Sequence, residues 1–287
     1  MSNLFGEMRY FPYLCRKIDN IMAKYSIITI NYNNAEGLRR TIKSVVSQTF
    51  VDYEYVIIDG GSTDGSVDVI KEYENKISYW VSEKDGGIYN AMNKGVKVAH
   101  GEYLIFMNSG DIFYSDSVLS DVRHHIQDED ILIGNVLASN THTMISPPPT
   151  NGKLTMYHLY SGAIPHQGTF VKLALQKKHP FDEILRIASD WKFFLQTIIF
   201  DNCTLKYINV NVALYDMAGL SSQNPLAMRE EKEKVLSEYL PPRVIEDYRL
   251  MKESECLTQT LTPMLKHRYS IDKLLYRIGK ILLSLKH

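Results

Sequence analysis

The sequence predicts an α/β fold, in which a wound, mostly parallel sheet is flanked by helices and followed by a helical C-terminal extension. Four apolar runs rich in β-branched residues alternate with three amphipathic helical patterns between residues 25 and 107. From about residue 224 the pattern becomes helical and rich in charged residues. The β-α-β-α-β-α-β order favours parallel strands joined by right-handed crossovers, because the helices must cover the faces of the sheet.

The first half of the chain contains the clearest elements. The run YSIITIN at 25–31 is apolar and β-branched, as expected of a strand that is covered on both faces. The first helix is expected to be capped by Asn34, the second by Ser62 or Thr63, and the third to cover residues 88–99. The other strands of this half are expected over 53–58, 77–82 and 102–107.

The second half is less regular. Strands are expected over 130–136, 164–171 and 204–215, and a helix capped by Ser189 over 189–200. We therefore expect three regions along the chain. These are an N-terminal extension over 1–24, an α/β domain over 25–222 and a helical C-terminal region over 223–287.

Composition and charge exclude several classes of protein. The chain has 287 residues and a formal net charge of -1, which gives no electrostatic reason to bind nucleic acid. Three widely spaced cysteines fit a reducing compartment and argue against a disulfide framework or a zinc module. No run approaches the roughly 18 apolar residues that a membrane span requires, so we expect a cytoplasmic protein. The dinucleotide fingerprint, the P-loop, the HExxH helix and the GxSxG elbow are all absent from the sequence.

Polar residues follow the successive strands of the first half. Residues 31–33 (Asn-Tyr-Asn), Asp59, Asp85 and Asp111 come at or just beyond the carboxyl ends of four strands. In an open parallel sheet these ends lie on one edge, where ligands bind. Asn, Asp and Gly are also ordinary turn residues, so a single loop of this kind decides nothing. Four such loops on one edge favour a binding site.

Several segments together resemble the family 2 glycosyltransferases with the GT-A fold. They are SIITINYNNAEGLRRTIKSVVSQTF, YVIIDGGSTDGSVDVIKEY, SEKDGGIYNAMNKGVKVAHGEYLIFMNSGD, IPHQGTF and ASDWKFF. The resemblance covers about residues 25–220 and is strongest to bacterial members that assemble surface polysaccharide. It implies inverting transfer of a sugar from a nucleotide-diphosphate sugar, with UDP as the expected nucleotide, to a saccharide or lipid-linked acceptor. It also implies Mg²⁺ or Mn²⁺ as the cofactor, and it makes the α/β domain a GT-A catalytic domain.

The resemblance assigns a nucleotide-binding role to the first three loops. Asp59 would read the base edge, since a carboxylate accepts hydrogen bonds from ring N–H groups. Tyr32 would stack on the base or simply pack beside the strand end. The nucleotide-binding set that the family pattern implies is Asn31, Tyr32, Asn33, Asp59, Gly60, Asp85 and Asn108.

The metal-binding position departs from the family pattern. The family commonly has D-x-D at the end of the fourth strand, but here Asn108 and Gly110 occupy both acidic positions. Only the following acid, Asp111, remains as a metal ligand. Mg²⁺ is often held by one or two carboxylates together with substrate phosphates and water, so Asp111 could suffice. The departure also leaves room for a protein that binds without catalysing.

The catalytic residue that the resemblance implies is Asp190, at the start of a helix. The helix dipole favours an ionised carboxylate there, as a general base requires. The alternative is an ordinary acidic residue in a first helical turn. The resemblance also suggests that His166, Gln167 and Trp191 line the sugar or acceptor pocket. His166 could also be an alternative base or a metal ligand, or could equally be structural, and Trp191 could belong to the core.

The C-terminal segment over 271–286 combines an apolar face with basic residues. A helix of this kind lies on an anionic membrane surface, docks on the catalytic domain or meets a homodimer partner. The first option predicts a peripheral location at the inner face of the cell membrane. Two other functions also fit parts of the sequence: a non-catalytic nucleotide-sugar-binding scaffold of a polysaccharide-assembly complex, and a sugar nucleotidyltransferase.

Overall fold

The computed structural model describes residues 24–145, 149, 153–217, 224–261 and 273. The chain divides into two compact units, one that ends at Lys232 and one that begins at Glu233. The first unit contains the sheet. The expected N-terminal extension and the basic segment over 271–286 lie outside the described residues, except for Lys24 and Lys273.

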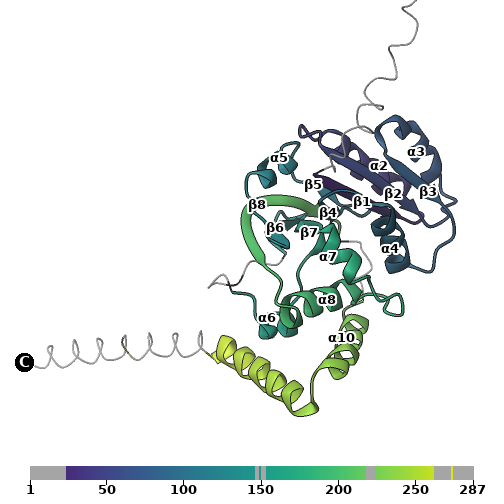
Figure 1. The fold of residues 1–287 in the computed structure, drawn as a ribbon. Coiled ribbons are helices and arrows are strands. Elements are labelled where there is room, and N and C mark those ends of the chain that lie inside the picture. Colours follow the sequence, from purple (N-terminus) through teal and green to yellow (C-terminus); the bar gives the residue numbers. More distant parts are fainter. Residues whose placement is uncertain (1–23, 146–148, 150–152, 218–223, 262–272, 274–287) are drawn as a thin grey trace, which may run out of the picture. The chain divides into compact units, whose positions relative to one another are not determined.

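An eight-stranded mixed sheet with the strand order β3-β2-β1-β4-β7-β6-β8-β5 organises the first unit (Figure 1). The first four strands in the chain are parallel to one another, and each was expected from the sequence. In β1 and β2 the register pairs Asn31 with Asp59, so their polar ends lie side by side. These strands are β1 (Tyr25–Asn31), β2 (Tyr53–Asp59), β3 (Tyr79–Ser82) and β4 (Tyr103–Phe106).

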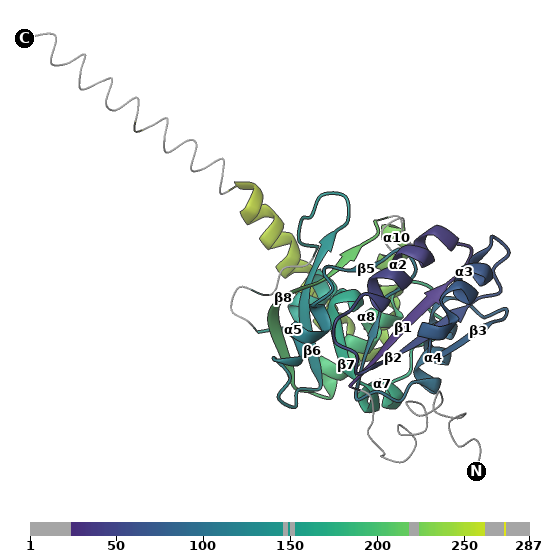
Figure 2. The same cartoon turned by 90° about the horizontal axis from the view of Figure 1, so that it is seen from above.

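The helices between these strands cover both faces of the sheet. Helices α2 (Ala35–Val46) and α4 (Ile88–Val98) lie on opposite sides of β1 and β2 (Figures 1 and 2). Side chains alternate along each strand, so Ile27 joins the cluster that contains α2, whereas Ile28 approaches Gly95 of α4. Burial on both faces explains why these strands are almost continuously apolar.

The start of α2 agrees with the sequence, but the start of the next helix differs. Asn34 caps α2 by accepting a hydrogen bond from the Gly37 N–H at 3.0 Å. Helix α3 (Ser66–Glu72) begins after Gly65, so the prediction of a cap at Ser62 or Thr63 is wrong. The Ser62 hydroxyl instead donates to Asp59 at 2.6 Å, and this local bond competes with capping. A short 3-10 turn, η1 (Glu74–Lys76), leads from α3 towards β3.

The second half adds the strands that make the sheet mixed. Strand β7 pairs antiparallel with both β4 and β6, and β8 pairs in parallel with β6. The expected strand over 164–171 is shorter than predicted, because its first residues form the 3-10 turn η2 (His166–Gly168). The strands are β5 (Ile112–Phe113), β6 (Ile131–Ala138), β7 (Thr169–Lys172) and β8 (Leu205–Tyr215).

The helices of the second half are mostly short. The expected helix over 189–200 begins as α8 (Ser189–Phe194) and continues as a π-helix, η3 (Leu195–Phe200). Ser189 does not cap it; its hydroxyl accepts from the Asp182 N–H at 2.6 Å. The other helices are α5 (Val118–Arg123), α6 (Met156–Ser161), α7 (Leu173–Lys178), α10 (Pro225–Tyr239) and a helix over 242–261. Within the described part of the chain, no helix is long and apolar enough to cross a membrane.

Candidate active site

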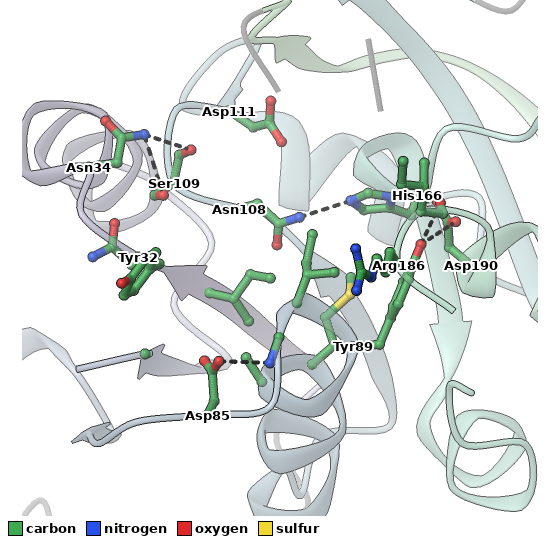
Figure 3. Close-up of a pocket in the computed structure, with 18 of the residues that line it drawn as sticks. Tyr32, Asn34, Asp85, Tyr89, Asn108, Ser109, Asp111, His166, Arg186 and Asp190 are labelled. Atoms are coloured by element: carbon green, nitrogen blue, oxygen red, sulfur yellow. Dashed lines mark hydrogen bonds and ion pairs between the residues drawn. The ribbon is translucent and has the colours of Figure 1, made fainter. Parts of the chain in front are cut away.

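A cavity of about 780 Å³ opens at the carboxyl ends of β1, β2 and β4 (Figure 3). It is the edge of the sheet at which the sequence predicts a ligand site. Its lining joins residues of the first half to residues of η2 and the loop before α8. Among the lining residues are nine that were predicted from the sequence: Asn31, Tyr32, Gly60, Asp85, Asn108, Asp111, His166, Gln167 and Asp190.

Asp59 forms the support beneath one end of the cavity. It is fully buried and is not among the lining residues. Its Oδ1 accepts from Asn31 Nδ2 at 2.7 Å and from the Ser62 hydroxyl at 2.6 Å, and its Oδ2 accepts from the Ser82 hydroxyl at 2.6 Å. Backbone N–H groups of Gly61 and Ser62 complete the set. Burial raises the pKa of Asp59, but these hydrogen bonds outweigh it and hold the pKa below its usual value.

This network fixes the orientation of Asn31. Because the ionised Asp59 only accepts hydrogen bonds, the neighbouring atom of Asn31 must be the amide nitrogen. The amide oxygen of Asn31 is then buried at the cavity without a hydrogen-bond partner among the described residues. Asn33 lies outside the lining. Its backbone is left-handed at φ 47°, and it bonds to the Ser62 and Thr63 loop.

Tyr32 and Asp85 approach each other above Gly60. The Tyr32 side chain is 66% exposed, which leaves its ring free to stack on a ligand. A Cβ atom on Gly60 would lie 2.7 Å from Asp85 Oδ2 and 3.2 Å from Tyr32 Cδ2. The other carboxylate oxygen of Asp85, Oδ1, accepts a hydrogen bond from the Gly87 N–H at 2.9 Å, which holds the side chain in place. Glycine at position 60 therefore allows both side chains to reach the cavity.

The opposite end of the cavity is built around Asp190. Its Oδ1 accepts from the Tyr89 hydroxyl at 3.0 Å and from the Trp191 N–H at 2.9 Å. Its Oδ2 lies 3.1 Å from His166 Nδ1. Burial raises the pKa of Asp190, but the hydrogen bonds from His166, Tyr89 and Trp191 outweigh it and hold the pKa below its usual value. The carboxylate is thus ionised while its side chain stays 20% exposed at the cavity.

His166 connects Asp190 with the loop after β4. Its Nε2 lies 3.1 Å from Asn108 Nδ2, which is a donor, so Nε2 accepts this bond. Nδ1 then carries the proton and donates it towards Asp190. This tautomer follows from the amide orientation assigned to Asn108, whose own oxygen is buried and unpartnered among the described residues.

Asp111 is a further acidic residue of the cavity, three residues after Asn108 in the loop that follows β4. Its side chain is 4% exposed, and its Oδ1 accepts from the Asp216 N–H at 2.9 Å. Burial raises the pKa of Asp111 to about 6. Gly110 has φ 108°, and a Cβ atom there would lie 2.9 Å from Asp216 Oδ2. The Asp216 carboxylate therefore lies beside the position from which a side chain at residue 110 would project.

The oxygen atoms of the described residues around Asp111 are too few to hold a cation by themselves, but they fit a cation that a bound ligand also coordinates. Within the described ranges no group of three or more His, Cys, Asp or Glu side chains is close enough to hold a metal ion. A divalent cation would nevertheless stabilise the ionised form of a buried carboxylate such as Asp111, whose pKa is raised and which has the Asp216 carboxylate nearby. Asp111 is therefore compatible with the weak, phosphate-assisted metal site that the sequence suggests.

Some site residues have a different environment from the one expected, and others were missed. Trp191 is 1% exposed, its indole N–H donates to Leu159 O at 2.8 Å, and it belongs to the core. Several lining residues were not identified from the sequence, because each looks ordinary in its local pattern, and the tertiary fold brings them to the cavity. Among them are Lys84, Tyr89, Arg186 and Asp216.

Comparison with known proteins identifies the family. The family model described as glycosyl transferase family 2 matches residues 26–185. An uncharacterized glycosyltransferase of Mycobacterium tuberculosis is 30% identical over 203 residues, which cover 69% of this chain and 76% of the relative. A PGL/p-HBAD biosynthesis glycosyltransferase of Mycobacterium bovis is 29% identical over 206 residues, which cover 69% and 79%.

Solved structures share the fold. Residues 1–349 of S. aureus TarS in complex with UDP-GlcNAc superpose with a TM-score of 0.62 at 20% identity, over 78% of this chain and 70% of that chain. Another TarS structure is covered over 42% of its chain. The mannosyltransferase PcManGT from Pyrobaculum calidifontis, in complex with GDP-Man and Mn²⁺, gives a TM-score of 0.54 at 15% identity, over 69% and 58%. With the family model matching more than half of the sequence, this chain belongs to glycosyl transferase family 2.

Proposed function

We propose that this protein transfers a sugar, with inversion, from a UDP-sugar to a hydroxyl group of a saccharide or lipid-linked acceptor in surface polysaccharide biosynthesis. The observation that carries the proposal is the ionised Asp190, held by three hydrogen bonds at one end of a cavity whose other end has the Asn31, Tyr32 and Asp85 surface. In this proposal the donor nucleotide binds at the Asn31, Tyr32 and Asp85 end of the cavity, and the acceptor hydroxyl binds at the Asp190 end.

The donor nucleotide would occupy the end formed by β1, β2 and the start of α4. Tyr32 offers a stacking surface for the base, and Asp85 lies where it can meet the ribose or diphosphate. Five hydrogen bonds within the protein already occupy the Asp59 carboxylate, so its proposed role is to hold Asn31 in place beneath this end of the cavity. TarS, which shares the fold, was solved with UDP and with UDP-GlcNAc, and this supports a UDP-sugar as the proposed donor. The mannosyltransferase of the same fold holds GDP-Man, so the fold itself accepts more than one nucleotide.

The acceptor would approach at the Asp190 end. The Asp190 carboxylate takes the proton of the acceptor hydroxyl while the oxygen of that hydroxyl forms a bond to the anomeric carbon of the donor sugar. The bond from that carbon to the diphosphate oxygen breaks, and the nucleoside diphosphate leaves with the electron pair. His166 and Tyr89 hold the carboxylate in place through hydrogen bonds of 3.1 and 3.0 Å, which fixes the direction from which it accepts the proton.

Asp111 would hold Mg²⁺ or Mn²⁺ together with the donor diphosphate, with Asn108 nearby. The cation supplies charge stabilisation to the leaving diphosphate. Lys84 and Arg186 also line the cavity, and their positive charge acts in the same direction. A mannosyltransferase of the same fold was solved in complex with Mn²⁺, which supports the use of a divalent cation in this proposal.

The acceptor class is inferred from relatives and from the sequence. The Mycobacterium bovis relative is named for PGL/p-HBAD biosynthesis, and a cholesterol galactosyltransferase of Borreliella burgdorferi is 39% identical over 98 residues, 33% of this chain and 27% of that protein. The second name is that of an enzyme that acts on a lipid, which supports a lipid-linked acceptor in this proposal. A peripheral position at the membrane, through residues 271–286, would suit that chemistry and belongs to this proposal.

Release of UDP from a panel of UDP-sugars, with added Mn²⁺ or Mg²⁺ and a lipid or saccharide acceptor, tests the function. We expect Asp190→Asn to lower turnover by about 10²- to 10⁴-fold, because a general base contributes roughly that factor. UDP binding should remain close to that of the wild type. Full turnover in Asp190→Asn would remove it as the base, and donor binding without turnover under every condition would identify a scaffold.

A further inference from the structure

Glu231, in the first turns of α10, makes an unusual contact with the loop that precedes the proposed base. Its Oε1 accepts from the Arg186 N–H at 2.8 Å, and its Oε2 accepts from the Ile187 and Ala188 N–H groups, both at 2.9 Å. One carboxylate therefore satisfies three consecutive backbone donors. All of these residues belong to the first compact unit, which ends at Lys232.

The neighbouring residue attaches the same turn of α10 to the other side of this region. Lys232 Nζ donates to Gly162 O at 2.6 Å and lies 4.8 Å from the centroid of the Trp191 ring. Trp191 is buried directly after Asp190. Two adjacent side chains thus hold the segments on both sides of the Asp190 carboxylate.

The loop that Glu231 holds is bonded to the base through Tyr89. The single proton of the Tyr89 hydroxyl is shared between Ile187 O at 2.6 Å and Asp190 Oδ1 at 3.0 Å. The position of the Ile187 peptide therefore influences how strongly this hydroxyl bonds to the carboxylate. Arg186, whose N–H Glu231 also binds, sends its side chain towards the cavity beside Tyr89 (Figure 3).

We propose that Glu231 is a positioning residue for the transfer reaction, which holds the 186–188 backbone so that Tyr89 and Asp190 keep their reactive arrangement. This inference rests on the proposed role of Asp190 as the base. Glu231 touches neither end of the cavity itself and acts only through the backbone of the loop. Hydrogen bonds that an ionised carboxylate accepts are charge-assisted and stronger than neutral ones, so three of them restrain a loop that carries no regular structure.

The test compares Glu231→Ala with Glu231→Gln and with Glu230→Ala, an exposed neighbour that serves as the matched control. We expect Glu231→Ala to lower kcat about 10- to 100-fold, since small displacements of a reacting group have effects of that size. The Kd for UDP should change less than kcat does, because Tyr32, Asp85 and Lys84 belong to other elements and only Arg186 of the proposed diphosphate contacts lies in this loop. Glu231→Gln retains one acceptor oxygen and should recover part of the loss, while Glu230→Ala should behave as the wild type.

A double-mutant cycle with Tyr89→Phe distinguishes positioning from general stability. If Glu231 acts through Ile187 and Tyr89, the kcat of Glu231→Ala/Tyr89→Phe is close to that of the more impaired single variant. Multiplicative effects on kcat, or a fall in melting temperature with unchanged kcat, would overturn the inference. If Glu231→Ala does not fold, the same cycle with Glu231→Gln gives the answer.

Asp190→Asn, measured beside these variants, keeps this inference separate from the proposed function. An active Asp190→Asn enzyme means that the base is assigned wrongly. An inactive Asp190→Asn enzyme together with fully active Glu231 variants means that only the positioning role is wrong.

Discussion

Gly60 offers the sharpest test of the nucleotide end of the cavity. In Gly60→Ala the new Cβ atom would lie 2.7 Å from Asp85 Oδ2, which is 0.7 Å short of the 3.4 Å at which ordinary van der Waals contact begins. It would also press on Tyr32 Cδ2 at 3.2 Å. Asp85 has to move, and its bond to the Gly87 N–H at 2.9 Å moves with it. The substitution therefore displaces two proposed ligand contacts at once.

The cost should appear in binding and leave stability nearly unchanged. The Asp85 carboxylate is the far end of a flexible side chain, so the fold can absorb its displacement at about 1 kcal/mol or less. A hydrogen bond between a charged group and the ligand contributes about 1–3 kcal/mol. Loss of that contact raises the Kd roughly 5- to 150-fold.

Gly65→Ala is the matched control, with the opposite expectation. Gly65 has φ 94°, and nothing lies within 4 Å of the position of its Cβ atom. Alanine there should cost about 1–2 kcal/mol of stability through backbone strain and leave binding unchanged.

Titration calorimetry with UDP and thermal unfolding of both variants measure the two effects separately. Wild-type affinity for UDP in a folded Gly60→Ala protein would refute the reasoning, because the Tyr32 and Asp85 surface would then not hold the nucleotide. A large loss of stability without a loss of affinity would refute it equally.

Two further predictions concern the support beneath the site and the C-terminal segment. Asp59→Asn should cost at least about 2 kcal/mol of unfolding free energy, because an amide group would face donors that the carboxylate now satisfies. Although burial raises it, the pKa of Asp59 is held by hydrogen bonds below the usual value of about 3.9, so its contribution to stability is complete above that pH and is lost as the pH falls through the lowered pKa. Urea unfolding of the wild type and of Asp59→Asn at pH 7 and at low pH measures this contribution. The difference in unfolding free energy should be smaller at low pH, and an equal difference at both pH values would contradict the prediction. Deletion of residues 268–287 should move the protein from the membrane fraction to the supernatant, and unchanged partitioning in a sedimentation assay would rule out that membrane contact.

The sequence predicted the first half of the fold closely because there the local signals agree with one another. The strand over Tyr25–Asn31 has the expected bounds, and Asn34 caps α2 as expected. A buried strand needs apolar residues on both faces, and a helix start needs a side-chain acceptor; both requirements are local. The cap of α3 failed for a physical reason, since Ser62 is bonded to the buried Asp59 and Gly65 begins the helix instead.

The second half was harder because its geometry depends on long-range pairing. The segment that begins at Ile164 looks like a strand, but only Thr169–Lys172 pairs with β4 and β6. The preceding turn places His166 between Asn108 and Asp190, and no local pattern indicates that contact. Glu231 looks in the sequence like any other acidic residue of a charged helix.

The sequence by itself determined the strand and helix order, the edge of the sheet that carries the polar loops, and the family that the motifs identify. It could do so because apolar periodicity and motif spacing are written along the chain. Only the tertiary structure decided that Asp59 lies buried under the site, that Tyr89 reaches Asp190, and that Glu231 binds three backbone N–H groups of a loop more than forty residues away. Burial and hydrogen bonding between distant segments depend on how the elements pack, and a local sequence pattern carries no record of that packing.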